Sequence, residues 1–170
     1  MGAIAIETKR LTLKTFAPTD ADDLFACITP AITRFTTWDP PASREAFADV
    51  WRSWVSAIHE ETEHYFIVRA KDDECCIGIV GLHAMQTPCP ELGIWLRLES
   101  HGQGFGKEAI SAVVSWASRE LQPKYFEYPV AEQNIASRRI AESLGGSIAG
   151  HRSNAKYNSV VYRIPNCVPR

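Results

Sequence analysis

The sequence predicts an α/β fold with a mixed, mostly antiparallel sheet of about six or seven strands, a central parallel pair, and helices on both faces. Residues 64–70 and 75–85 are apolar runs on either side of a polar turn, which is a hairpin signature. Further along, a strand, an amphipathic helix after Gly106 and a second strand at 125–131 follow in order. That order favours a parallel pair joined by a right-handed crossover.

Three elements are expected before the hairpin. Residues 10–15 alternate between apolar and polar side chains and predict a strand. Thr19 is the expected N-cap of a helix that Thr29 and Pro30 end, and Ser43 is expected to begin the next helix. The tryptophans of that second helix have two interpretations, core packing or a wall beside a substrate. Its apolar stripe contains Phe47, Val50, Trp51, Trp54, Val55 and Ile58.

The remaining elements complete the predicted sheet. A dense apolar run at 92–98 predicts a buried strand, and Asn134 is the expected N-cap of a helix that the glycines at 145 and 146 end. Residues 147–151 and 157–164 predict a final hairpin. No second domain or repeat is visible, so residues 1–170 are expected to form a single domain.

Composition excludes several classes of function. The net charge of −2 gives no reason to expect nucleic-acid binding, and no apolar run reaches transmembrane length. The N-terminal residues lack a signal-peptide pattern, so a cytoplasmic protein is expected. Five cysteines without a Cys-x-x-Cys pair indicate reduced thiols, and five histidines without ligand spacing predict no metal. The oligomeric state, monomer or homodimer, stays open.

A glycine-rich turn separates the strand at 92–98 from the long helix. Gly102, Gly104 and Gly106 alternate there, and a helix start offers unpaired N–H groups and a partial positive charge. Together these features predict a phosphate or pyrophosphate site. The spacing fits neither a P-loop nor a dinucleotide fingerprint, since Lys107 is followed by Glu108. A flexible loop before an ordinary core helix is the alternative interpretation.

Four stretches in the right order resemble the GNAT N-acetyltransferase superfamily. Residues 101–106, HGQGFG, resemble its Gln/Arg-x-x-Gly-x-Gly/Ala acetyl-CoA motif. Residues 102–109, GQGFGKEA, resemble more specifically the RimJ/RimL-like branch, as do 7–13 (ETKRLTL), 91–96 (ELGIWL) and 134–145 (NIASRRIAESLG). The chain departs from the pattern at His101, which replaces Gln or Arg, and at Gly146, which replaces an aromatic residue.

The resemblance implies a GNAT-like fold, acetyl-CoA as cosubstrate and an amine acceptor, with no metal. It implies Glu91 as the general base and Ser137 as the acid toward the CoA sulfur, and backbone groups on the fourth strand as partners of the thioester. The turn and the helix that Asn134 caps would bind the rest of the donor. The expected cosubstrate-binding residues are Trp95, Leu96, Leu98, His101, Gly102, Gln103, Gly104, Phe105, Gly106, Lys107, Asn134 and Ser137.

Several alternatives stay open at this point. Tyr157 or Tyr162 could replace Ser137 as proton donor, and Cys75, Cys76 or Cys89 raises a route through an acetylated thiolate. The acceptor is a protein N-terminal α-amine or a small-molecule amine, attacked directly in a ternary complex. A non-catalytic sensor or interaction module that binds CoA or acetyl-CoA is the alternative function.

Overall fold

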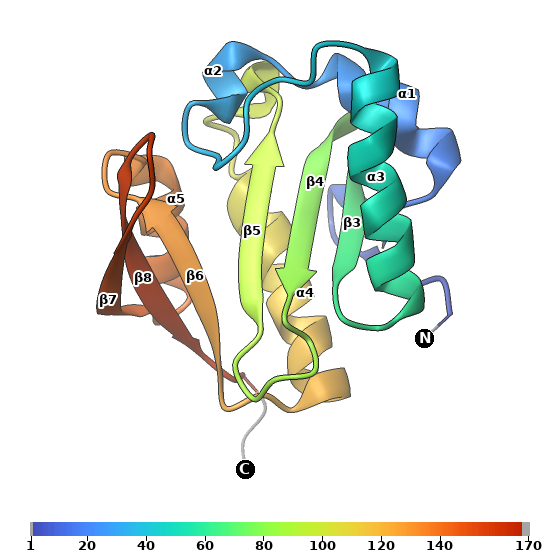
Figure 1. Ribbon diagram of the computed structural model, residues 1–170. Helices are drawn as coiled ribbons and strands as arrows, with labels where there is room; N and C mark the ends of the chain where they lie inside the picture. The colour runs from blue at the N-terminus through green and yellow to red at the C-terminus, as the bar shows by residue number, and fades with distance from the viewer. Residues whose placement is uncertain (1, 168–170) are drawn as a thin grey trace.

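The computed structural model describes residues 2–167 and contains an eight-stranded sheet in the order β1-β2-β3-β4-β5-β6-β8-β7 (Figure 1). Neighbouring strands are antiparallel except for β5 and β6, so the mixed sheet and its internal parallel pair are confirmed. The strands are β1 Ala5–Glu7, β2 Leu11–Thr15, β3 His64–Ala70, β4 Cys76–His83, β5 Glu91–Leu96, β6 Tyr125–Ala131, β7 Ser147–Ser153 and β8 Asn158–Pro165.

The strand that the sequence analysis did not expect is β1, which forms a hairpin with β2. The Thr8 N–H donates to the Leu11 carbonyl at 2.9 Å and closes the turn between them. β1 is three residues long and mostly exposed, so the apolar pattern that marks a strand in a sequence is weak there.

Helices cover both faces of the sheet, as predicted. α4 Phe105–Leu121 packs against one face, with Ile110, Val113 and Ala117 fully buried, and α5 Ile135–Ser143 packs against α4 and β6. α1 Ala21–Ala26 and α3 Arg44–His59 lie on the other face, and the short α2 Pro30–Thr33 lies beyond the end of β5 (Figure 1). Each face therefore has its own apolar cluster, with the sheet between them.

Two predicted boundaries in the first helical region are wrong. Thr19 lies inside a 3-10 turn, η1 Pro18–Asp20, and Asp20 is the residue whose carboxylate accepts the Ala17 N–H at 3.0 Å. Thr29 begins α2 instead of ending α1, because its hydroxyl accepts the Ile32 N–H at 3.3 Å. A threonine followed by proline fits a helix start as well as a helix end.

The start of α3 is confirmed, since the Ser43 hydroxyl accepts the Ala46 N–H at 3.0 Å. Its apolar stripe is less buried than the sequence suggests. Phe47 is 3% exposed, whereas Val50 and Val55 are 40% and 37% exposed. Trp54 packs in the core, where it stacks on Tyr65 at 4.7 Å. It also lines a pocket, and its role as a wall beside a substrate stays a prediction.

Gly145 and Gly146 end α5 as expected. Gly145 has a φ of +78°, and the N–H groups of Gly145 and Gly146 donate to the carbonyls of Glu142 and Ala141. This is the Schellman arrangement. A Cβ at Gly146 would lie 2.7 Å from the Ala141 carbonyl oxygen, so the aromatic residue expected from the family pattern has no room there.

Candidate active site

A wedge between β5 and β6 is the central feature of the site (Figure 1). The two parallel strands pair only where Glu91 meets Glu127, and the Glu127 N–H donates to the Pro90 carbonyl at 2.9 Å. The alternation of bonds in β6 then points the nitrogen of Pro129 toward β5. Proline has no N–H, so the ladder ends at this point and the strands diverge.

The divergence exposes backbone groups of β5 to the wedge. The Arg97 N–H donates to the Ile77 carbonyl of β4 at 2.8 Å. Because bonding directions alternate along a strand, the N–H groups of Ile94 and Leu96 point toward β6 instead. Leu96 was expected from the sequence, and Ile94 joins it. Trp95 faces the opposite way in this alternation, and Leu98 lies beyond the strand, exposed in the 3-10 turn η2 Leu98–Ser100.

The glycine turn lies at the start of α4, as predicted. Gly102 and Gly104 have φ values of +72° and +80°, which L side chains rarely adopt, and Gly104 is the N-cap. A Cβ at Gly106 would instead meet the Ile140 side chain at 3.0 Å. Gly106 therefore allows a close approach of α4 to α5, and Lys107 is exposed beside it.

Two polar side chains of the turn brace it. His101 Nε2 lies 2.8 Å from the Leu96 carbonyl oxygen, and the Gln103 amide donates to the Glu99 carbonyl at 2.8 Å. The His101 ring therefore contacts backbone, where the family pattern suggests a side chain turned to phosphate. The first-turn N–H groups of α4 remain free of intrahelical partners.

Glu108 ties the turn to the β1–β2 hairpin. Its carboxylate accepts hydrogen bonds from the Thr8 hydroxyl at 2.6 Å, the Arg10 N–H at 2.8 Å and Arg10 Nε at 2.7 Å. Arg10 also donates to the Gln103 carbonyl at 2.8 Å and lies over the Phe105 ring at 4.4 Å. Burial alone would raise the Glu108 pKa, but these hydrogen bonds lower it below its usual value.

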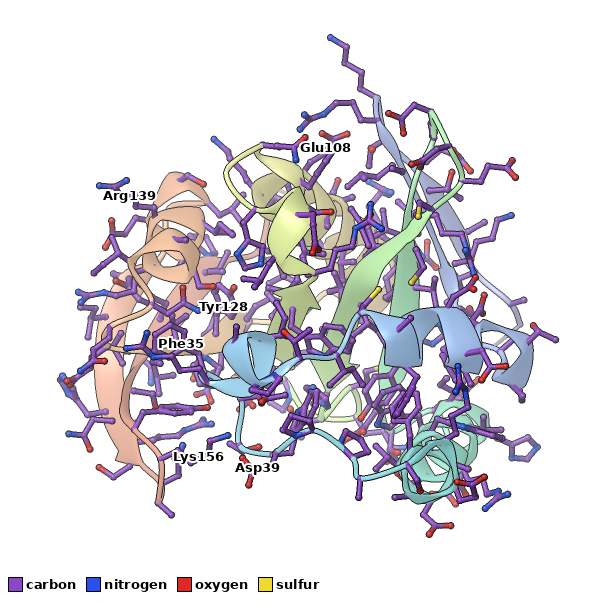
Figure 2. All side chains as sticks on the ribbon, turned by 90° about the horizontal axis from the view of Figure 1, so that it is seen from above. Phe35, Asp39, Glu108, Tyr128, Arg139 and Lys156 are labelled. Atoms are coloured by element: carbon purple, nitrogen blue, oxygen red, sulfur yellow. The ribbon has the colours of Figure 1, made fainter. Side chains whose placement is uncertain are left out.

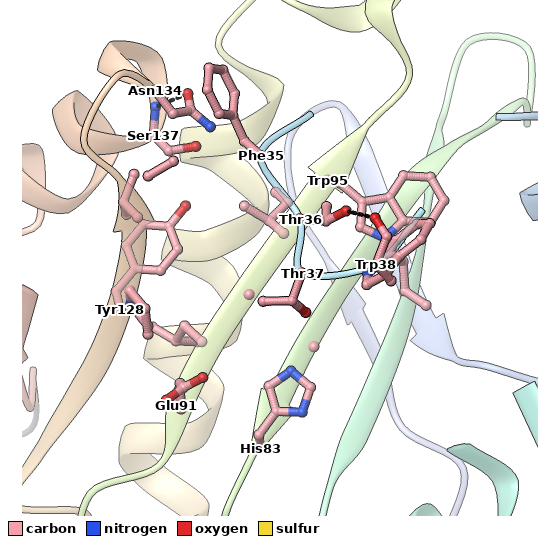
Figure 3. Close-up of a pocket in the computed structure, with 18 of the residues that line it drawn as sticks. Phe35, Thr36, Thr37, Trp38, His83, Glu91, Trp95, Tyr128, Asn134 and Ser137 are labelled. Carbon is pink, nitrogen blue, oxygen red and sulfur yellow. Dashed lines mark hydrogen bonds between the residues drawn. The ribbon is translucent and has the colours of Figure 1, made fainter. Parts of the chain in front are cut away.

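Asn134 and Ser137 lie at the start of α5 on the β6 side of the wedge. The Asn134 side-chain oxygen accepts the Ser137 N–H at 3.2 Å, which confirms the predicted cap. Both residues line a pocket that continues from the wedge, and Figure 3 shows the Tyr128 hydroxyl on the side of the ring that faces Ser137.

Tyr128 of β6 is a site residue that the sequence analysis missed. Its hydroxyl is the buried side-chain polar atom that lacks a hydrogen-bond partner within residues 2–167. Burial raises the pKa of Tyr128 to about 12, and the nearby Ser137 partly offsets the effect. A buried hydroxyl without a hydrogen-bond partner destabilises the fold unless a ligand supplies the missing hydrogen bond. Tyrosine alternating with apolar residues in a strand is typical of a core, so no sequence signal distinguished it.

The pocket has a volume of about 440 Å³ and many aromatic side chains in its walls (Figure 3). Its floor contains Gly81 and Gly93, which are directly opposed on β4 and β5. The pair Ile79 and Trp95 flanks these glycines on one side and the pair His83 and Glu91 on the other. The His83 ring lies over the two facing glycines, since a Cβ at Gly81 would be 2.8 Å from its Nε2 and a Cβ at Gly93 3.6 Å from it. The aromatic residues of the lining, besides His83, are Phe35, Trp38, Phe47, Trp54, Tyr65, Trp95, Tyr128 and Tyr157.

Glu91 lines this pocket at the start of β5, where the sequence analysis placed it. Its carboxylate accepts a hydrogen bond from Arg152 Nη1 at 2.7 Å, and Arg152 Nη2 donates to Glu127 at 2.6 Å. Glu91 is therefore held in an ion pair, and its carboxylate also faces the cavity.

His83 is a second titratable group that the sequence analysis did not single out. It lies opposite Glu91 on β4, and its Nδ1 is 3.3 Å from the Glu63 carboxylate. Glu63 also accepts a hydrogen bond from the Tyr65 hydroxyl. Glu63 and Tyr65 hold His83 across the pocket floor from Glu91.

The other candidate donors and nucleophiles separate clearly. Tyr157 lines the pocket, whereas the buried Tyr162 donates its hydroxyl hydrogen to Glu142 at 2.8 Å, away from it. All five cysteines are free. None of them lines the pocket: Cys75 and Cys76 lie in a separate hollow beneath α1, where Arg97 contacts Cys75 Sγ at 3.1 Å.

Within residues 2–167, no group of three or more His, Cys, Asp or Glu side chains could hold a metal ion. No helix in the same range has the length and apolarity needed to cross a membrane.

Comparison with known proteins settles the family. The model of the acetyltransferase (GNAT) domain matches residues 10–147. The chain belongs to the GNAT acetyltransferase family. The resemblance seen in the sequence is therefore confirmed, and with it an acetyl-CoA-dependent acetyltransferase activity.

Relatives and solved structures agree with this membership. An uncharacterized N-acetyltransferase of Bacillus subtilis, YoaA, is 26% identical over 94% of this chain and 95% of its own length. The ribosomal L7/L12 alpha-N-protein acetyltransferase RimL shares the fold with a TM-score of 0.84 at 14% identity, covering 97% of this chain and 96% of RimL. A spermidine N-acetyltransferase from Vibrio cholerae, solved with CoA and spermine, shares the fold with a TM-score of 0.77 at 21% identity. The match covers 92% of this chain and 95% of the spermidine enzyme.

Proposed function

We propose that this protein transfers the acetyl group of acetyl-CoA to a primary amine by direct attack within a ternary complex. The observation that carries the proposal is that β5 and β6 diverge from Glu91 and Glu127 toward the end of β5 that leads into the glycine turn, and that residues of both strands also line the pocket. A donor held by the turn and an acceptor held by the pocket would meet in the wedge. Such positioning replaces an encounter in solution.

The chain offers contacts for the pyrophosphate, the pantetheine arm and the thioester carbonyl of acetyl-CoA. The free N–H groups at the start of α4, with the residues His101, Gly102, Gln103, Gly104, Phe105, Gly106 and Lys107, would bind the pyrophosphate. Asn134 would contact the pantetheine arm. Acetyl-CoA supplies an acyl group activated as a thioester. The N–H groups of Ile94 and Leu96, which point into the wedge, would polarise its carbonyl oxygen.

Two protons move in this scheme, and the chain has a group for each. The amine nitrogen forms a bond to the acyl carbon and gives its proton to Glu91, directly or through water. The carbon–sulfur bond breaks, and the departing sulfur takes the proton of the Ser137 hydroxyl. Solvent then returns a proton to Ser137, and Glu91 releases the amine proton to solvent, so both side chains regain their starting states. The products are an N-acetylated amine and CoA with a free thiol. Residues on opposite sides of the wedge thus serve the two ends of the reaction.

The RimJ/RimL-like branch is the best-supported subfamily, since RimL shares the fold over nearly the whole chain. The acceptor within this proposal is a protein N-terminal α-amine or a small-molecule amine. RimL is named for the first class and the spermidine enzyme for the second.

A thiol-release assay with acetyl-CoA and a panel of primary amines tests the proposal. Release of free thiol together with a product heavier by one acetyl group is expected. Calorimetric titration with acetyl-CoA is run on the same preparation. A protein that binds acetyl-CoA but releases no thiol with any amine would be a sensor, and the proposed catalysis would be wrong.

A further inference from the structure

Resting on the proposed acetyl transfer, we propose that the acceptor is a compact primary monoamine with a flat aromatic body, and that Lys156 enforces this choice. The argument concerns residues 34–42, called the strap here, which connect α2 to α3 and contribute one side of the pocket. The strap runs past the end of β5 toward the β7–β8 hairpin (Figure 1).

Lys156 fastens the strap to that hairpin. Its ammonium donates to the Thr33 carbonyl at 2.8 Å, the Trp38 carbonyl at 3.0 Å and the Asp39 carboxylate at 2.9 Å. A lysine ammonium has three N–H donors, so these acceptors use its full capacity. Figure 2 shows Lys156 reaching from the hairpin to the strap beside Asp39. The two sides of the acceptor pocket are therefore tied together.

The strap is also packed onto the pocket. The Thr36 hydroxyl donates to the Trp38 carbonyl at 2.9 Å, and the Trp38 ring lies edge-on to Trp95 of β5 at 5.8 Å. The Lys156 contacts thus bridge the strap and the β7–β8 hairpin on this side of the pocket. A protein N-terminus brings a chain of further residues that needs an open groove, whereas a small amine does not.

The wall chemistry favours an aromatic body over an aliphatic one. The rings of Trp38 and Trp95 form one aromatic wall, and the stacked pair of Trp54 and Tyr65 forms another. Gly81 and Gly93, with the flat His83 ring over them, form the floor of the same cavity. Flat rings stack favourably on such surfaces.

The charges disfavour an acceptor with several ammonium groups. The acidic residues of the pocket lining are Asp39 and Glu91. Asp39 is paired with Lys156 at the rim, where its side chain is 83% exposed, and Glu91 is paired with Arg152 further in. A distal ammonium of a linear polyamine inside the pocket would have to displace Arg152 from Glu91, because a cation taken out of water needs a partner. A monoamine requires only the group that accepts the proton of its reacting nitrogen.

The test compares kcat/KM for 2-phenylethylamine, spermidine and an alanine-initiated tetrapeptide. For the unaltered protein, kcat/KM should be at least about tenfold higher for 2-phenylethylamine than for the other two, the scale on which pocket contacts discriminate substrates. Lys156→Met keeps the side-chain length but removes all three donors. In this variant, kcat/KM for the tetrapeptide should rise, so that the ratio of kcat/KM for 2-phenylethylamine to kcat/KM for the tetrapeptide becomes smaller. Lys9→Met, at an exposed lysine near the opposite edge of the sheet, is the matched control and should leave the ratio unchanged.

A higher kcat/KM for the tetrapeptide or spermidine in the unaltered protein would overturn the inference, and so would an unchanged ratio in Lys156→Met. Calorimetric titration of the CoA-bound protein with 2-phenylethylamine separates this inference from the proposed catalysis. Saturable binding of 2-phenylethylamine without turnover of any amine would support the acceptor site and contradict the proposed acetyl transfer. Absence of saturable binding and of turnover with 2-phenylethylamine would overturn the acceptor assignment itself.

Discussion

Glu91 and Arg152 form a 2.7 Å ion pair at the edge of the aromatic pocket, and the same guanidinium is 2.6 Å from Glu127. One arginine is thus shared by two carboxylates, of which only Glu91 lines the cavity. This arrangement fixes the direction of the Glu91 carboxylate while leaving it open to the acceptor. It also supplies an internal comparison between a catalytic and a structural role.

Glu91→Gln should lower kcat by about 10²–10⁴-fold at neutral pH, the usual value of general-base catalysis. Acetyl-CoA affinity should be nearly unchanged. The loss should shrink as pH rises, because free amine then becomes available without a base. A pH–rate profile of both proteins with the same acceptor measures this.

Glu127→Gln is the matched control for Glu91. It removes the other carboxylate from Arg152 and should change the melting temperature more than kcat. If both variants lose activity equally at every pH, the role of Glu91 is structural. If His83→Gln shows the pH-dependent loss and Glu91→Gln does not, the base is His83, held by Glu63.

Ser137→Ala should lower kcat more than it lowers acetyl-CoA affinity, because the proton reaches the sulfur only as the bond breaks. Tyr128→Phe should act in the same direction, since its buried hydroxyl lacks a partner within the described residues. Tyr162→Phe is the control, because that hydroxyl is bound to Glu142 and Arg138. If both Ser137→Ala and Tyr128→Phe keep the full kcat, the proton donor to the sulfur is Tyr157 or water.

Gly104→Val should raise the acetyl-CoA dissociation constant strongly, through obstruction of the phosphate site. Because Gly104 has a φ of +80°, valine also strains the backbone. Gly104→Asn separates the two effects, since asparagine tolerates this conformation while adding a side chain. Calorimetry should show weakened binding in both folded variants. Normal affinity in Gly104→Asn would mean that strain alone explains the valine variant.

The fold was predictable from local patterns, and the errors fall where a residue serves two purposes. Thr29 and Pro30 suit either end of a helix, and only the packed structure shows that they begin α2. β1 carries too few buried residues to produce a clear strand pattern. Asn134 as a helix cap could be predicted because its side chain acts within one turn.

The site was less predictable, because its partners are distant in sequence. Nothing near Glu91 in the chain indicates Arg152, and nothing near Lys156 indicates Asp39. Tyr128 looks like a core residue until its unpaired hydroxyl is placed beside Ser137. The wedge depends on whether the nitrogen of Pro129 points toward β5 or toward β8. That direction follows from the register of β6 with β8, which the sequence alone does not give.

Pro129→Ala tests the origin of the wedge. Alanine supplies an N–H toward the Leu92 carbonyl, the next position of the ladder after Glu127. A net gain of about 0.5–1.5 kcal/mol for one hydrogen bond would favour a narrower wedge and lower acetyl-CoA affinity by about two- to tenfold. Hydrogen exchange should show protection of the new backbone amide that this substitution introduces. Rapid exchange of that amide with unchanged affinity would mean that the strands diverge for another reason.

His64 makes the stability of the fold depend on pH. It is 2% exposed, packs beside Phe66 and Trp116, and its Nε2 lies 2.9 Å from the Thr15 hydroxyl. Burial lowers the pKa of His64 from its ordinary value of 6.5 to about 4. Between these values the unfolded chain binds a proton that the folded chain rejects.

The free energy of unfolding should therefore be highest above pH 6.5 and fall as the pH is lowered toward 4. A pKa shift of this size lowers the free energy of unfolding by about 3 kcal/mol when the pH has fallen to 4. His64→Gln removes the titrating group and should flatten this slope, whatever its effect on stability at neutral pH. His59→Gln, at an exposed histidine, should keep the slope. Urea unfolding at several pH values between 4 and 7.5 measures it, and equal slopes in all three proteins would place the acid sensitivity on carboxylates instead of His64.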